Sequence, residues 1–221
     1  MIVTIDGPAG AGKSSVARKL AERLGFQFLD TGAMYRAVTL AALRRKVDLQ
    51  DPEAIGKLAS QVTLRFDKQR VYLDEVEVTK QIRTAEVTDQ THFVAKNTAA
   101  RAHLVQLQQR MAFGLDTVTE GRDQGTVAFP KAECKFFLTA SDEERARRRW
   151  AQLKAEGIDV ELSEVLAKQR QRDQDDAARA VGPLVPAHDA VIVSTDGLTE
   201  EEVVDRLVGL VRNKMQEIGY A

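Results

Sequence analysis

The segment Gly7-Pro8-Ala9-Gly10-Ala11-Gly12-Lys13-Ser14 constrains the fold more than any other part of this chain. It fits the pattern G-x-x-x-x-G-K-[ST], follows an apolar run that ends at Asp6, and precedes a stretch with helical spacing. The glycines allow successive backbone N–H groups to turn inward and bind phosphate oxygens at the positive end of the following helix. We therefore predict a nucleotide-binding phosphate loop that also includes Ser15. Lys13 is expected to reach the β and γ phosphates, and the Ser14 hydroxyl is expected to ligate Mg²⁺.

Strand and helix patterns alternate along the chain, which predicts an α/β fold with a parallel sheet between helices. Predicted strands cover residues 1–6, 26–30, 117–120, 135–139 and 191–194. Predicted helices cover residues 14–24, 33–45, 84–95, 98–113, 142–155 and 163–172, and further helices begin after Asp51 and at Thr199. Three short alternating runs at 62–66, 70–73 and 76–79 predict a small antiparallel sheet inserted into this frame.

Composition limits the possible partners and the cell compartment. The formal net charge of the 221 residues is -1, so we expect no nucleic-acid partner and no attraction to an anionic membrane. No apolar run approaches the roughly 20 residues of a membrane span. Cys134 is the single cysteine and lies in an apolar run, which indicates a buried thiol and suits a reducing cytosol. The sequence thus predicts a cytoplasmic protein with one main domain, and we expect a monomer.

The phosphate loop does not say what the nucleotide is used for, but other segments do. A GTPase would carry Asn-Lys-x-Asp or Thr-Lys-x-Asp after a later strand, and the one Thr-Lys pair, Thr79-Lys80, continues differently. Three segments remain to be explained: Asp30-Thr31-Gly32-Ala33-Met34-Tyr35-Arg36, Glu120-Gly121-Arg122-Asp123-Gln124-Gly125-Thr126, and Arg172-Asp173-Gln174-Asp175-Asp176-Ala177-Ala178-Arg179. Together with the phosphate loop and Gly182-Pro183-Leu184-Val185-Pro186, they make the chain resemble the bacterial-type cytidylate kinases, a branch of the nucleoside monophosphate kinase family.

The resemblance covers nearly the whole chain and implies an architecture. The expected fold is a three-layer P-loop nucleotide-kinase fold with a five-stranded parallel sheet and a small inserted antiparallel sheet. Residues 1–61 and 83–221 are expected to form the ATP-binding core, with a lid near 145–180. Residues 62–82 are expected to form the inserted sheet of the monophosphate-binding domain. One departure from the family pattern is Gln124, where an apolar residue is usual.

The resemblance also implies a role for each matching residue. Arg36 and Arg122 would hold the acceptor phosphate with Thr31 beside it, Arg101 and Asp123 would read cytosine, Arg172 and Asp176 would hold the ribose, and Arg179 would complete the monophosphate pocket. Tyr35 is interpreted either as a further substrate-binding residue or as a packing residue of its helix. Lys13, Arg36, Arg122 and Arg172 would be the catalytic residues. Arg145 and Arg148 are interpreted either as lid residues that contact ATP or as part of a solvated helix face. Asp30 would hold a Mg²⁺-bound water, and the base contact near position 92 falls on Thr91 or His92.

The chemistry of these residue types agrees with those roles. Guanidinium groups bind phosphate oxygens bidentately and stay charged at every relevant pH. A carboxylate accepts from the N4 amino group of cytosine, whereas uracil presents an acceptor at that position, so Asp123 favours cytosine. We predict transfer of the γ-phosphate of ATP to CMP, and also to dCMP, giving CDP or dCDP and ADP. The alternatives are another small-acceptor kinase on this frame, of uridylate or shikimate type, and a non-catalytic ATP-binding regulator.

Overall fold

The computed structural model describes residues 1–67, 69–155 and 157–220, so Lys68 in the first predicted turn of the inserted sheet lies outside it. The chain divides into two compact units. The first unit joins Met1–Leu29 to Gly114–Ala221, and the second is Asp30–Phe113. The predicted insert at 62–82 therefore shares a unit with the helices on either side of it, which the sequence-based division assigned to the core. The role of that unit in monophosphate binding stays a prediction.

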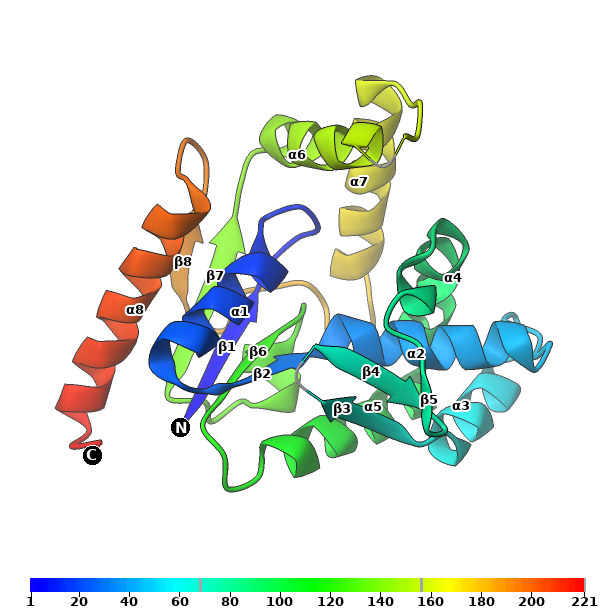
Figure 1. Cartoon of the computed structure of the whole chain (residues 1–221), viewed down its shortest axis with the longest axis horizontal. Coiled ribbons are helices and arrows are strands. Elements are labelled where there is room, and N and C mark those ends of the chain that lie inside the picture. Colours follow the sequence, from blue (N-terminus) through cyan, green and yellow to red (C-terminus); the bar gives the residue numbers. More distant parts are fainter. Residues whose placement is uncertain (68, 156, 221) are drawn as a thin grey trace. The chain divides into compact units, whose positions relative to one another are not determined.

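The first unit is built on a five-stranded sheet with the strand order β2-β6-β1-β7-β8 (Figure 1). Its strands are β1 Ile2–Asp6, β2 Gln27–Asp30, β6 Thr117–Glu120, β7 Cys134–Thr139 and β8 Val191–Ser194. β1 pairs in parallel with β6 and β7, and β7 pairs in parallel with β8. The predicted strands are thereby confirmed. In open parallel sheets, ligands bind beyond the carboxyl ends of the strands, so the carboxyl end of the central strand β1 marks the expected binding site.

Two helices pack together against this sheet, α1 (Lys13–Leu24) and α8 (Glu200–Glu217). Their apolar stripes, including Val16, Leu20 and Leu207, form one buried cluster with the strands. Burial of such side chains stabilises each by about 1.5–3 kcal/mol relative to exposure. Cys134 is part of the same cluster, as predicted, and burial raises the pKa of its thiol to about 11. The thiol is therefore a neutral packing group near neutral pH.

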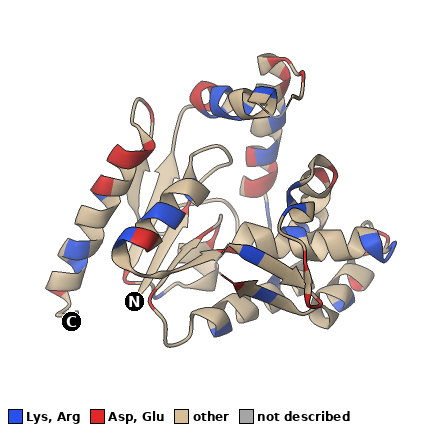
Figure 2. Ribbon diagram, in the orientation of Figure 1, with Lys and Arg blue, Asp and Glu red and all other residues tan. Residues whose placement is uncertain are grey.

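Helix α8 shows clearly how local sequence sets a helix boundary. The Thr199 hydroxyl accepts from the backbone N–H of Glu202, and the Glu202 carboxylate accepts from the Thr199 N–H, which completes a capping box. Three glutamates occupy its first turn and Lys214 its last, as the helix dipole favours (Figure 2). Neither α8 nor any other helix within the described ranges has an apolar stretch long enough to cross a membrane.

Helices α6 (Asp142–Ala155) and α7 (Leu162–Ala177) complete the first unit with a short π-helical turn η2 (Gln124–Ala128). Acidic and basic residues are frequent along α6 and α7 (Figure 2). Ion pairs join the two helices at Arg145–Asp173, Arg170–Asp142 and Arg170–Glu143. The sequence prediction ended the second of these helices at Arg172, which was wrong. The helix continues through the charged run to Ala177, because Asp173 pairs with Arg145 of α6 and so stabilises the last turns.

Over residues 30–67 and 69–113, the second unit contains four α-helices and the antiparallel sheet, which confirms the predicted small sheet. The helices are α2 Thr31–Arg44, α3 Pro52–Gln61, α4 Ala85–Lys96 and α5 Thr98–Ala112, and a 3₁₀ turn η1 covers Gln81–Arg83. The strands β3 Leu64–Asp67, β4 Arg70–Leu73 and β5 Val76–Glu77 pair in that order. Asp51 caps α3 as predicted, since its carboxylate accepts from the N–H groups of Glu53 and Ala54.

Candidate active site

The phosphate loop connects β1 to α1, as the motif predicts. Gly7, Gly10 and Gly12 have φ angles of 143°, 80° and 83°, which L-residues with a side chain rarely adopt. At Gly7 the backbone also passes so close to β7 that an added Cβ would lie 2.0 Å from the Leu138 carbonyl oxygen. Glycine is therefore required at Gly7 both by backbone conformation and by space.

Lys13 and Ser14 begin α1 directly beneath the loop. The Lys13 ammonium is buried and donates to the Pro8 carbonyl oxygen at 2.7 Å. Burial is the main cause that lowers the Lys13 pKa to about 7, and the nearby charges of Arg122 and Arg172 lower it further. The Ser14 hydroxyl donates to a carboxylate oxygen of Glu120 at 2.9 Å. The end of β6 thus meets the start of α1 at the predicted magnesium position.

Three of the predicted acceptor residues lie together in the first unit. The Arg122 Nε donates to Asp176 at 2.9 Å, and Arg179 forms an ion pair with the other oxygen of the same carboxylate. Asp176 is buried, and the two guanidinium groups share its single charge. Guanidinium groups that a carboxylate holds in place can also bind the oxygens of a phosphate group.

Asp123 follows Arg122 and is buried at the entrance of η2. The N–H groups of Gln124 and Gly125, at the start of this turn, donate to the two oxygens of Asp6 at 2.8 and 2.7 Å. Burial raises the Asp6 pKa to about 6, although both of these N–H groups act to lower it. Gln124 points its side chain back onto β6, where its Oε1 accepts from the Thr119 hydroxyl at 2.9 Å. That contact explains how a polar side chain is accommodated at this buried position.

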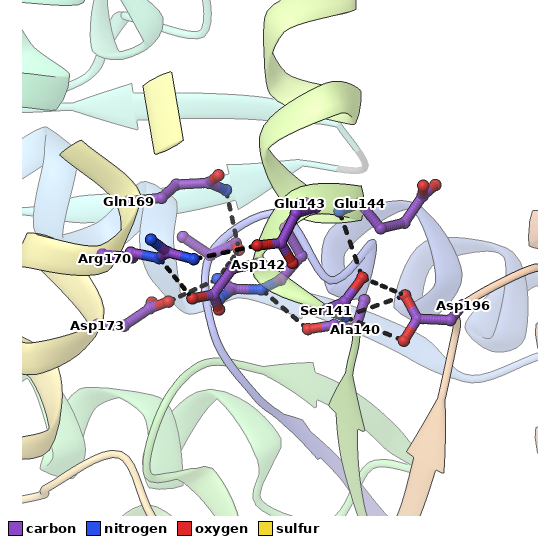
Figure 3. A network of polar contacts seen from close by, with 11 residues as sticks. Ala140, Ser141, Asp142, Glu143, Glu144, Gln169, Arg170, Asp173 and Asp196 are labelled. Carbon is purple, nitrogen blue, oxygen red and sulfur yellow. Dashed lines mark hydrogen bonds and ion pairs between the residues drawn. The ribbon is translucent and has the colours of Figure 1, made fainter. Parts of the chain in front are cut away.

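Helices α6 and α7 contact the phosphate loop through a polar network (Figure 3). Arg145 donates to the carbonyl oxygens of Ala9 and Ala140 and pairs with Asp142 and Asp173. Gln169 of α7 also donates to the Ala9 carbonyl, at 3.3 Å. The Arg145 side chain is 4% exposed, so it belongs to no solvated face. Arg148 instead contacts Glu144 and Thr195.

Arg172 lies in α7 of the first unit, and the remaining predicted residues lie in the second unit. Asp30 caps α2 through the Ala33 N–H at 2.8 Å and lies 3.5 Å from the Arg36 guanidinium. Arg83 also donates to Asp30, at 3.1 Å. The buried Nε of Arg36 has no hydrogen-bond partner among the residues that the structure describes, so this side chain retains a donor for an anion. Thr31 is buried in the first turn of α2.

Arg101 and Tyr35 contact each other within the second unit. The Arg101 guanidinium lies 5.8 Å from the centre of the Tyr35 ring, within the range of a cation–π interaction. Arg101 is 3% exposed and donates to the Ala95 carbonyl oxygen at 3.3 Å. Near the predicted base contact, the Thr91 hydroxyl donates to the Val87 carbonyl oxygen, and His92 Nδ1 lies 2.7 Å from the Asp89 carbonyl oxygen. Both of these polar groups are thus engaged within α4.

Sequence reasoning gave no role to several residues that the structure places at the site. Asp6 and Glu120 end the neighbouring strands β1 and β6, and the carboxyl ends of parallel strands meet at one edge of a sheet. Their positions at the ends of two predicted strands could therefore have identified both carboxylates as site residues from the sequence. Arg83, Gln169 and Asp173 carried no comparable signal, because only the folded chain brings them to Asp30, Ala9 and Arg145.

The central parallel strand β1 leads into the phosphate loop, and Arg122 and Arg179 pair with Asp176 in the same unit. This combination is typical of a P-loop phosphotransferase. The family model described as cytidylate kinase matches residues 3–213. The chain belongs to the cytidylate kinase family.

Individual relatives agree with that assignment. The chain is 49% identical to cytidylate kinase of Rhodopirellula baltica over 216 residues, which covers 98% of this chain and 94% of the relative. It is 50% identical to cytidylate kinase of Desulforamulus reducens over 209 residues, covering 93% and 94%. Among solved structures, TT1252 from Thermus thermophilus matches with a TM-score of 0.53 at 17% identity, covering 97% of each chain. Shikimate kinase from Bacteroides thetaiotaomicron matches with a TM-score of 0.51 at 15% identity, covering 96% of this chain and 98% of its own. These structures share the fold.

Proposed function

We propose that this protein transfers the γ-phosphate of ATP to CMP, and also to dCMP, giving ADP and CDP or dCDP. One observation carries the site assignment. The phosphate loop and the cluster of Arg122, Asp176 and Arg179 belong to one compact unit, with Lys13 under the electrostatic influence of Arg122. A donor phosphate on the loop and an acceptor phosphate near the arginines are the two ends of a phosphoryl transfer.

On the donor side, residues 7–15 surround the phosphates of ATP, and all of them except Pro8 can donate a backbone N–H. Lys13 now donates to Pro8, and a bound nucleotide offers it a phosphate oxygen in place of that neutral carbonyl. Arg145 and Gln169 both donate to the Ala9 carbonyl oxygen, so they stabilise the backbone of the phosphate loop. Arg148 remains the better candidate for direct contact with ATP, since its side chain is 31% exposed against 4% for Arg145.

The oxygen groups at the start of α1 suit Mg²⁺, which prefers carboxylate and hydroxyl ligands together with substrate phosphates. Ser14 would bind the ion directly, and Glu120, whose carboxylate contacts Ser14, would hold one of its waters. Asp30 is a second candidate for a water ligand, although Arg36 and Arg83 already pair with it. When bound, the ion neutralises charge on the β and γ phosphates.

On the acceptor side, Arg36, Arg122, Arg172 and Arg179 bind the monophosphate, with Thr31 beside it. Asp176 orients Arg122 and Arg179 and is expected to accept from a ribose hydroxyl, while Arg172 donates to a ribose oxygen. Asp123 and Arg101 read cytosine, and Tyr35 packs against Arg101. The acceptor phosphate oxygen is already anionic, so no general base is needed. Catalysis is then alignment and charge neutralisation by Lys13 and the arginines.

The test is a coupled assay of ADP release with Mg²⁺ and a panel of acceptors: CMP, dCMP, UMP, AMP and shikimate. We expect turnover that depends on CMP or dCMP and is far lower with the other acceptors. Lys13→Ala is expected to remain folded and to lose that turnover. A purified wild type that releases ADP at the same rate with and without CMP would contradict the proposal. The monomeric state and cytoplasmic location proposed from the sequence are tested separately, by mass in solution and by fractionation.

A further inference from the structure

The turn that carries Arg122 and Asp123 obtains its capping interaction from a distant part of the chain. The first N–H groups of a helical turn have no acceptor within the turn and need one from outside it. Asp123 occupies the cap position of η2, and aspartate is a favoured cap residue, yet it makes no side-chain cap bond there. The two oxygens of Asp6, the last residue of β1, accept from the Gln124 and Gly125 N–H groups instead. Asp6 lies 118 and 119 positions earlier in the chain.

We propose that Asp6 is a positioning residue for acceptor recognition, holding the turn at 124–125 with both carboxylate oxygens and thereby fixing Arg122 and Asp123 against the phosphate loop. This inference rests on the proposed function, because it assigns Asp6 a part in how that site selects its acceptor. Asp6 itself is 4% exposed and contacts backbone groups, so it acts through the neighbouring residues.

The surroundings of Asp6 leave the turn little freedom to take another position. The backbone N–H of Gly121 donates to the Ile5 carbonyl at 3.0 Å, which fixes the start of the segment on β1. A Cβ added at Gly125 would lie 3.0 Å from the Thr4 hydroxyl and 3.4 Å from an Asp6 oxygen, so the backbone approaches β1 closely. Thr119 holds the Gln124 side chain on β6. The acceptor at the turn is the Asp6 carboxylate, and hydrogen bonds to a charged acceptor are stronger than those between neutral groups.

Asp6 also connects the phosphate loop to the segment that carries Arg122 and Asp123. It is followed at once by Gly7, the first residue of the loop, so the same residue ends β1 and caps η2. A shift of Asp6 would therefore move Arg122 and Asp123 relative to the loop. Misplacement by about 1 Å can reduce the rate of such a transfer by about a hundredfold.

The experiment compares Asp6→Asn with the wild type in steady-state kinetics for CMP, UMP and ATP. Asparagine keeps the size but offers one acceptor oxygen, and its NH₂ group faces one of the two N–H donors. We expect kcat/KM for CMP to fall about ten- to a hundredfold, the CMP-to-UMP preference to fall with it, and the KM for ATP to change by less than about threefold. Leu207→Ala is the matched control, because it destabilises the same unit from α8 and is expected to leave the CMP-to-UMP preference unchanged.

A second readout does not depend on activity. Amide hydrogen exchange at Gln124 and Gly125 is expected to accelerate in Asp6→Asn and not in Leu207→Ala measured at equal stability. If Asp6→Asn does not fold, Thr119→Val is the alternative variant, because it removes only the hydrogen bond to the Gln124 side chain. It is expected to lower the CMP-to-UMP preference by a smaller factor. An unchanged preference together with unchanged exchange at these two amides overturns the positioning role. A wild type without CMP-dependent turnover overturns the proposed function instead, and the exchange measurement still tests the hold of Asp6 on the turn.

Discussion

Replacing Gly7 by alanine tests the contact between the phosphate loop and the sheet. Two separate costs are expected. The φ angle of 143° lies in a region that is nearly restricted to glycine, and holding another residue there costs about 1–3 kcal/mol. The added Cβ would also lie 2.0 Å from the Leu138 carbonyl oxygen, whereas real Cβ contacts are not shorter than 3.0 Å. The loop or β7 must therefore move by at least about 1 Å to accept the methyl group.

This displacement affects both stability and rate. Leu138 lies within the β7 ladder, paired with Val193, so a shift of its carbonyl disturbs the pairing of β7 with β8. Strain and displacement together are expected to lower the free energy of unfolding by about 3 kcal/mol or more. A movement of about 1 Å at the phosphate loop is expected to reduce kcat/KM by about a hundredfold.

Gly12→Ala is the matched comparison within the same loop. Gly12 has a φ angle of 83°, but an added Cβ there meets nothing within 4 Å. Only the backbone cost remains, about 1–2 kcal/mol. The assay is urea unfolding of both variants followed by fluorescence, with ADP release measured in parallel. Equal losses of stability in the two variants would refute the argument that the approach to Leu138 demands glycine.

Three further predictions concern the acceptor side and the core. Arg122→Ala is expected to lower the rate of transfer by on the order of 10³-fold with little change in ATP affinity, measured by nucleotide titration; equal losses of ATP and CMP affinity at constant turnover would contradict its assignment. Asp123→Asn adds a donor opposite the base, so the CMP-to-UMP ratio of kcat/KM is expected to fall about ten- to two-hundredfold, and an unchanged ratio removes Asp123 from base recognition. Because burial raises the pKa of Cys134 to about 11, the unfolded chain ionises first as pH rises above its ordinary value of 9.0. Stability is expected to fall between about pH 9 and 11, and Cys134→Ala is expected to flatten that dependence.

Local signals were enough to predict most secondary structure. Asp51 and Thr199 begin helices because their side chains bind N–H groups only two or three residues away. The end of α7 shows where such signals fail. Its last turns are rich in aspartate and arginine, and the contact that stabilises them comes from Arg145, 28 positions earlier. A pattern confined to the helix carries no information about that partner.

The sequence by itself predicted the phosphate loop from the spacing of its glycines, and the resemblance to the cytidylate kinases singled out the arginines of the acceptor side. Only the tertiary structure decided which groups these residues meet. Ser14 reaches Glu120 across 106 positions, Arg122 reaches Asp176 across 54, and Asp6 reaches Gln124 across 118. Each of these contacts depends on which strands become neighbours and on where a buried carboxylate finds its N–H donors. That choice is made by packing of the whole sheet, because burying an unpaired polar group costs free energy that no local pattern reveals.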